Sequence, residues 1–98
     1  MTYTNSQKNL ISALIGTKIT PRTKSASLRQ SLMLVNEHLY SGELTVSDLI
    51  LLNSALELLV PDAPEDENKE EYRELIEALM VTRGILREKE EADDAAEG

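Results

Sequence analysis

Apolar residues recur along the chain at the three- and four-residue spacing that is typical of amphipathic helices. The first stripe contains Leu10, Ile11, Leu14 and Ile15. Thr4 and Gln7 precede it at the spacing of a capping box, in which each side chain accepts a hydrogen bond from the other residue's backbone N–H. Gly16 follows, and glycine often ends a helix because it adopts the left-handed conformation without strain. The pattern predicts a first helix of about three turns that ends at Gly16.

A polar connector, residues 17–27, separates this stripe from the next one. Pro21 excludes the interior of an ordinary helix there, because proline lacks the backbone N–H that the helix needs. The second helix therefore begins either at Thr20, with Pro21 as its first helical residue, or near Ser25. Its apolar positions are Leu28, Leu32, Met33, Leu34, Val35 and Leu39. We expect this helix to end at Gly42.

The third helix is predicted over residues 46–60, which are apolar over most of the helical circumference. Thr45 and Asp48 form a second capping box before it, and Pro61 ends it. Its narrow polar face consists of Asn53, Ser54 and Glu57. A helix this apolar must be covered on several sides, so we expect it to be the central helix of the fold.

Residues 61–64 read as a short linker, and residues 65–88 as a fourth, strongly acidic helix. The apolar face expected to pack on the other helices contains Tyr72, Leu75, Ile76, Leu79, Met80 and Leu86. Residues 89–98 have no apolar side chain larger than alanine, and this composition predicts a flexible acidic tail.

These elements predict an all-α protein, a small four-helix bundle with an apolar central third helix and an acidic C-terminal helix and tail. The 98 residues have room for one domain, residues 1–88, whose compact part is 1–60. The chain contains no cysteine, which favours a reducing compartment, and no apolar run approaches the roughly 20 residues that span a bilayer. We therefore expect a cytoplasmic protein that does not cross a membrane.

Charge is divided unevenly along the chain. Residues 1–60 carry five Lys or Arg and four acids, whereas residues 61–98 carry 14 of the 18 acids and five cations. The acidic part repels nucleic acid and acidic membranes and attracts basic surfaces.

Several kinds of chemistry find no support in the sequence. The glycine spacing matches neither the phosphate-binding loop nor the dinucleotide fingerprint, and His38 is the only histidine, so no histidine pair can bind zinc. Asp66, Asn68, Glu70 and Glu77 have calcium-loop spacing, but Glu71 stands where that loop needs glycine. We expect no metal, no cofactor and no catalytic residue, and we interpret His38 as a partly exposed helical residue.

Four cations of the connector and second helix are candidates for phosphate contact: Lys18, Arg22, Lys24 and Arg29. No aromatic residue stands among them to stack on a base. The plainer interpretation is a polar connector whose cations meet the acids of the fourth helix. A helix-turn-helix is excluded, because residues 46–60 offer leucine and isoleucine where a recognition helix offers polar side chains.

The fourth helix contains a second apolar group with acids beside it, and it is our candidate surface for a partner. Its residues are Glu74, Glu77, Ala78, Val81, Ile85 and Glu88. Such a surface suits a partner protein or a homodimer, unless the helix is sandwiched and both of its stripes are internal.

We therefore expect a non-enzymatic protein-interaction or regulatory protein, such as an inhibitor that binds a basic surface of its target through the fourth helix and tail. The alternatives are a nucleic-acid-associated protein that uses residues 18–29, although direct binding of nucleic acid is disfavoured by the net charge of −8, and a structural subunit of a larger assembly.

Overall fold

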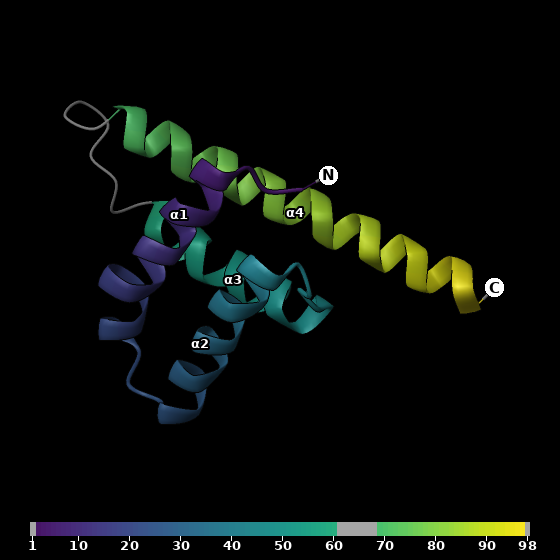
Figure 1. The fold of residues 1–98 in the computed structure, drawn as a ribbon, viewed down its shortest axis with the longest axis horizontal. Coiled ribbons are helices and arrows are strands. Elements are labelled where there is room, and N and C mark those ends of the chain that lie inside the picture. The colour runs from purple at the N-terminus through teal and green to yellow at the C-terminus, as the bar shows by residue number, and fades with distance from the viewer. Residues whose placement is uncertain (1, 61–68, 98) are drawn as a thin grey trace.

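The computed structural model describes residues 2–60 and 69–97, and the regular elements among them are all helical. They are α1 (Asn5–Leu14), η1 (Ile15–Ile19), η2 (Thr20–Arg22), α2 (Ala26–Ser41), α3 (Val46–Leu59) and α4 (Lys69–Glu97). Figure 1 shows α1, α2 and α3 gathered beneath α4, which crosses them and continues beyond them. The predicted all-α four-helix bundle is confirmed. The predicted linker 61–64 lies outside the described residues.

Side-chain caps begin the first three α-helices. The Thr4 N–H donates to Gln7 Oε1 (2.9 Å), and the Gln7 N–H donates to Thr4 Oγ1 (3.1 Å). Thr45 and Asp48 make the same reciprocal pair, so both predicted capping boxes are confirmed. Ser25 caps α2, which decides between the two predicted starts of that helix.

The predicted helix end at Gly16 is wrong. The chain continues through Gly16 as the π-helical turn η1 and then as the 3₁₀ turn η2. Ile15 and Ile19 are both buried, so the apolar stripe of α1 extends past the glycine, and a helical path is needed to keep it facing the core. The change in helical pitch brings the chain to Pro21, which supplies no N–H for a continued α-helix.

One continuous hydrophobic core joins all four α-helices. Its fully enclosed aliphatic residues are Ile11, Val35, Leu39, Leu49, Leu52 and Leu56. The helix α3 packs against both α2 and α4, and α4 also contacts α1. Aliphatic side chains therefore carry the packing, with Tyr3 as the one buried aromatic residue in the described part of the chain.

Only one side of α3 is covered. Leu49, Leu52 and Leu56 are fully buried, whereas Ile50 is 49% exposed and Leu58 is 75% exposed. The expectation that α3 is covered on several sides is therefore wrong for its outer face. A bundle of this size lacks the helices to surround one member completely.

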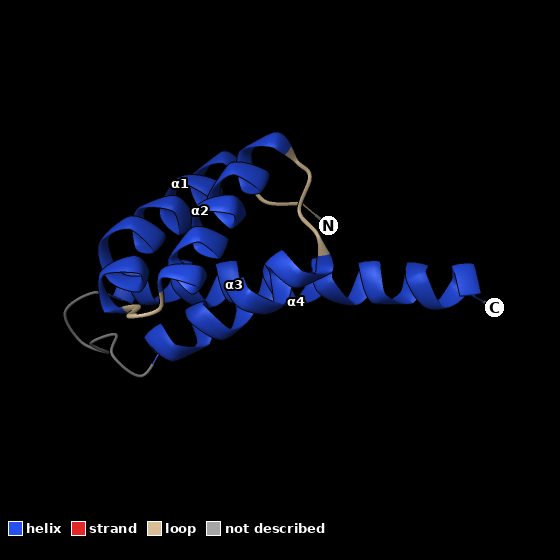
Figure 2. Cartoon of the chain, turned by 90° about the horizontal axis from the view of Figure 1, so that it is seen from below, coloured by secondary structure: helices blue, strands red, loops and turns tan. Residues whose placement is uncertain are grey.

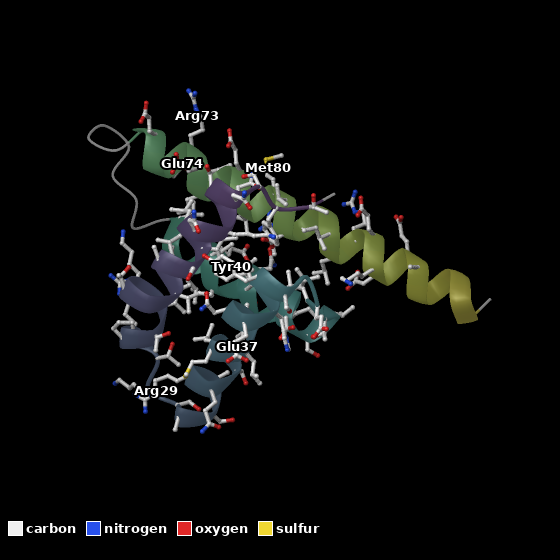
Figure 3. The ribbon with its side chains drawn as sticks, viewed as in Figure 1. Arg29, Glu37, Tyr40, Arg73, Glu74 and Met80 are labelled. Atoms are coloured by element: carbon white, nitrogen blue, oxygen red, sulfur yellow. The ribbon has the colours of Figure 1, made fainter. Side chains whose placement is uncertain are left out.

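The face that α4 turns to the bundle includes most of the predicted residues, but not Met80. Leu75 and Leu79 are buried as expected, but Met80 is 64% exposed and points outward from the helix in Figure 3. The helix begins at Lys69 in the described residues and continues to Glu97 rather than ending at Glu88. Its last turns extend past the other helices in Figure 2.

Candidate functional site

The candidate partner residues on α4 do not form one exposed surface. Ala78 is fully buried and Ile85 is 9% exposed, and Val81 is half-buried against the core. The prediction of an outer apolar patch is therefore wrong for Ala78 and Ile85. They alternate with Leu75 and Leu79 along the buried side of one helix, so the two stripes inferred from the sequence belong to a single broad face.

The acids of that candidate surface remain exposed, but they lie in two places. Glu74 and Glu77 line a hollow of about 200 Å³ together with residues at the start of α1, which are Thr4, Ser6, Gln7 and Leu10. Glu88 lies further along α4, where it lines a different hollow together with Leu39 and Leu44. The structure therefore does not bring the three predicted carboxylates together.

A buried polar contact joins the N-terminal segment to α4. The hydroxyl of Thr82, which is fully buried, donates to the carbonyl oxygen of Ala78 (2.7 Å). Because a hydroxyl has one proton, the Tyr3 hydroxyl must be the donor in its 2.5 Å contact with Thr82 Oγ1. Burial raises the pKa of the Tyr3 hydroxyl above its ordinary value.

The projecting part of α4 is acidic. From Leu86 to Ala92 no residue is buried, and Glu88, Glu90 and Glu91 are exposed. Residues 90–97 contain five acids and no cation. All side-chain charges of this segment, which we call the acidic extension, are therefore negative.

A hollow of about 370 Å³ lies at the base of the acidic extension. The N-terminal segment, the turn between α2 and α3, and α4 enclose it. Leu39, Leu44 and Ile85 give it an apolar lining. The charged residues of the lining are Lys8 from α1 and Glu88 and Lys89 from α4, and Ala92 lines it from the projecting side of α4. Its volume is within the range of about 300–1,000 Å³ that is usual for ligand pockets.

A second opening lies on the opposite side of the bundle, between η1 and η2, the start of α2 and the end of α3. This groove has a volume of about 250 Å³. Ile19, Leu28 and Leu32 line one part of it, and Leu51, Ala55, Leu58 and Leu59 line the part that belongs to α3. We call it the leucine groove.

Two of the four candidate phosphate-contacting cations lie at the leucine groove. Lys18 and Arg22 line it and are exposed, and both come from the wall formed by η1 and η2. Lys24 and Arg29 are also exposed but do not line it; Figure 3 shows Arg29 near the start of α2. The structure thus divides the predicted basic segment and places half of it beside leucine side chains.

His38 is a partly exposed helical residue, as expected, but it has a specific role at the corner between α2 and α3. Its Nδ1–H donates to Asp48 Oδ2 at 2.7 Å, because an ionised carboxylate can only accept. Its carbonyl oxygen accepts from the N–H of Gly42, whose φ of 82° makes the left-handed turn. The hydrogen bond between His38 on α2 and Asp48 on α3 fixes the angle between the two helices.

The Asp48 carboxyl is held in its ionised form. Partial burial alone would raise the pKa of Asp48. Three hydrogen bonds outweigh this effect and lower the pKa below 3.8; they come from the Thr45 backbone, the His38 ring and the Thr45 side chain. The attraction of the imidazole acts in the same direction. The Ser41 hydroxyl donates to the carbonyl oxygen of His38 (3.4 Å) and therefore does not donate to the imidazole ring. The contacts of His38 and Asp48 together stabilise the corner between α2 and α3.

The described residues contain no group of three or more His, Asp or Glu arranged to hold a metal ion. Asp66 and Asn68 of the calcium-loop pattern lie outside them. Of the helices in the described ranges, none combines the length and apolar character needed to span a bilayer.

Comparison of the chain with models of protein families, with curated proteins and with solved structures finds no significant match. The function must therefore be inferred from the hollow of about 370 Å³, the leucine groove with its cations, and the acidic extension.

The sequence reasoning missed both hollows and the buried Thr82. Each hollow is assembled from three separate parts of the chain, so no local motif marks it. Ile11, Ile15 and Ile19 recur at intervals of four residues, and this spacing could have indicated that the helical path continues past Gly16. The continued path places Lys18 at the leucine groove.

Proposed function

We propose that this chain is a non-enzymatic regulatory protein that binds a basic surface of another protein through the acidic end of α4. It acts as an inhibitor, because a chain that covers the basic surface of its target excludes other ligands from that surface. The observation that supports this best is the apolar hollow at the base of the acidic extension.

The two features have complementary uses. The five acids of the extension attract a cationic surface over a distance set by ionic strength, about 10 Å at 0.1 M salt. The hollow beside them offers Leu39, Leu44 and Ile85 to an apolar side chain or to the aliphatic stem of Lys or Arg. Attraction alone gives fast but short-lived encounters, whereas a buried contact slows dissociation.

The nucleic-acid alternative has less support. Lys18 and Arg22 border a groove whose other lining residues are mainly aliphatic, and the groove has no aromatic side chain on which a base could stack. Binding of nucleic acid that depends on these two cations would replace the proposal with the alternative.

The test is affinity purification of the tagged chain from its native cells, followed by binding measurements with the purified partner. Replacing Glu90 and Glu91 with Gln should weaken binding by about tenfold at low salt and much less at high salt, because their contribution is screened. Replacing Glu37 and Glu70 with Gln is the matched control, because these exposed acids lie outside the extension and line neither hollow, and it should have little effect.

A second variant tests whether the hollow contributes to binding. Ala92→Leu places a larger side chain at the rim while keeping a good helix former, so it should weaken binding at any salt concentration without lowering the melting temperature. A purified partner that binds both variants as it binds wild type would refute the proposal. Self-association that survives both changes would instead indicate a structural subunit.

A further inference from the structure

The leucine groove lies on the other side of the bundle from the acidic extension, and neither feature requires the other. The floor of the groove is aliphatic. Two exposed leucines lie at its rim: Leu58 is 75% exposed and Leu28 is 47% exposed. An exposed leucine is common on protein surfaces, but two of them at the rim of one apolar groove mark a surface that another molecule can cover.

The charge at the groove has one sign. Lys18 and Arg22 are the charged residues among its lining, and both are cations, although the whole chain carries a net charge of −8. The connector 17–27 that supplies them contains no acid. The groove therefore complements a ligand that has apolar side chains next to negative charge.

The dimensions favour part of a macromolecule over a small molecule. At about 250 Å³, the groove is below the usual range of small-molecule pockets, so a ligand confined to it would leave Leu58 largely in water. The groove is lined by helices, whose interior backbone groups are already hydrogen-bonded to one another, so it offers few partners to an extended peptide. A helix brings its own backbone hydrogen bonds and presents only side chains.

From these observations we propose that the leucine groove binds an acidic amphipathic helix of another protein. The apolar side chains of that helix, spaced at three and four residues, cover Leu58 and fill the groove. Carboxylates on the adjacent side of the helix pair with Lys18 and add to the interaction that Arg22 already makes within the chain. This site is separate from the one assigned to the acidic extension, and it makes the chain a connector with two surfaces of opposite charge preference.

A second copy of this chain fits the groove poorly through its own acidic extension. After Leu86, which is half-buried in its own bundle, the extension has no apolar side chain larger than alanine. Carboxylates alone would meet Lys18 and Arg22 but would leave the leucine side chains uncovered.

The test is a selection from a displayed library of helical peptides with randomised apolar and charged positions, using the folded full-length chain as bait. The enriched peptides should combine a stripe of Leu, Ile or Met at helical spacing with flanking Asp or Glu. A synthetic peptide of the enriched sequence should lose at least about tenfold in affinity for Leu58→Asp, because a charge then faces its apolar stripe.

Matched variants separate the groove from general effects. Leu34→Asp makes the same change at an exposed leucine outside the groove, and Lys24→Glu reverses an exposed connector cation outside it; both should bind like wild type. Lys18→Glu combined with Arg22→Glu should shift the preference toward peptides with Lys or Arg beside the apolar stripe. Circular dichroism melts show whether each variant is folded. If Leu58→Asp is unfolded, the double variant at Lys18 and Arg22 still tests the proposal.

The proposal is overturned if no helical peptide is enriched, or if the enriched peptides are basic and ignore the reversal at Lys18 and Arg22. Binding of anionic phospholipid vesicles that is lost in Leu58→Asp, without peptide binding, would assign the groove to a lipid surface instead. A wild-type dimer that becomes monomeric in Leu58→Asp would assign it to a second copy. Deleting residues 90–98 should leave peptide binding unchanged, so failure of the acidic-extension proposal does not affect this one.

Discussion

The inner and outer faces of α3 are built from the same kinds of residue but have opposite surroundings. Leu56 is fully buried in the hydrophobic core, whereas Leu58, two positions further on, is 75% exposed at the leucine groove. The inner face stabilises the fold and the outer face remains open to another molecule. Leucine content alone therefore does not identify the core side of a helix; the positions of the covering helices do.

The largest predicted effect separates these two leucines. Leu56→Asp buries an unpaired charge, which costs several kcal/mol and is comparable to the total stability of a small domain, so this variant should be unfolded at room temperature. Leu58→Asp places its charge in solvent and should change the free energy of unfolding by less than about 0.5 kcal/mol. Urea titrations followed by circular dichroism measure both. Equal destabilisation by the two changes would mean that the outer face is covered.

A smaller effect on stability is expected for substitution of Asp48, which lies in the first turn of α3. Asp48→Ala removes the acceptor for the Thr45 N–H and the His38 ring and should cost about 1–2 kcal/mol near neutral pH. The pKa of Asp48 is lowered in the folded state, so its contribution is present above the ordinary value of 3.8 and is lost as pH falls through the lower folded value.

The pH dependence is the check on that interpretation. The difference in unfolding free energy between wild type and Asp48→Ala should shrink between about pH 5 and about pH 2, because the protonated carboxyl no longer attracts the imidazole. Asp48→Asn keeps the shape and an acceptor oxygen, and it should lose less stability than Asp48→Ala near neutral pH. A difference that is constant with pH would show that the charge of Asp48 contributes nothing.

The smallest effect concerns the helix that covers the inner face. Tyr3→Phe removes one hydrogen bond to α4 and should cost about 1 kcal/mol, while Thr82 keeps its bond to the Ala78 carbonyl. The pKa of Tyr3 is raised, so its contribution is fully present below the ordinary value of 10.0 and is lost as pH rises through the higher folded value. The stability advantage of wild type over Tyr3→Phe should therefore shrink above about pH 10, as measured by urea unfolding. An advantage that persists there would argue against a buried Tyr3 hydroxyl.

Local chemistry predicted the parts of the fold that depend on neighbouring residues. Both capping boxes and the left-handed end of α2 at Gly42 follow from side chains within a few positions of one another, and the structure has them as predicted. The end at Gly16 failed because burial of Ile19, a tertiary effect, maintains the helical path across a residue that tolerates several conformations.

The faces of α4 show why the candidate site was harder to predict. Ala78 is small and Thr82 is polar, so neither stands out as a core position in a hydrophobicity pattern, yet both are fully buried. Without them the sequence shows two separate stripes, and Ile85 is assigned to the wrong one. At the leucine groove, the cations Lys18 and Arg22 were identifiable from the sequence, but the leucines beside them come from α2 and α3 and meet only in the folded chain.

The contact between Tyr3 and Thr82 also has a consequence for the order of folding, because it spans 79 positions of sequence. The contact between His38 and Asp48 spans 10. Each doubling of a closed loop costs about 0.6 kcal/mol of chain entropy, so the longer closure costs about 2 kcal/mol more. The corner between α2 and α3 should therefore form early in folding, and the contact between the N-terminal segment and α4 should form last and open first. Amide protons at the start of α1 would then exchange through a partial opening that leaves α2 and α3 protected.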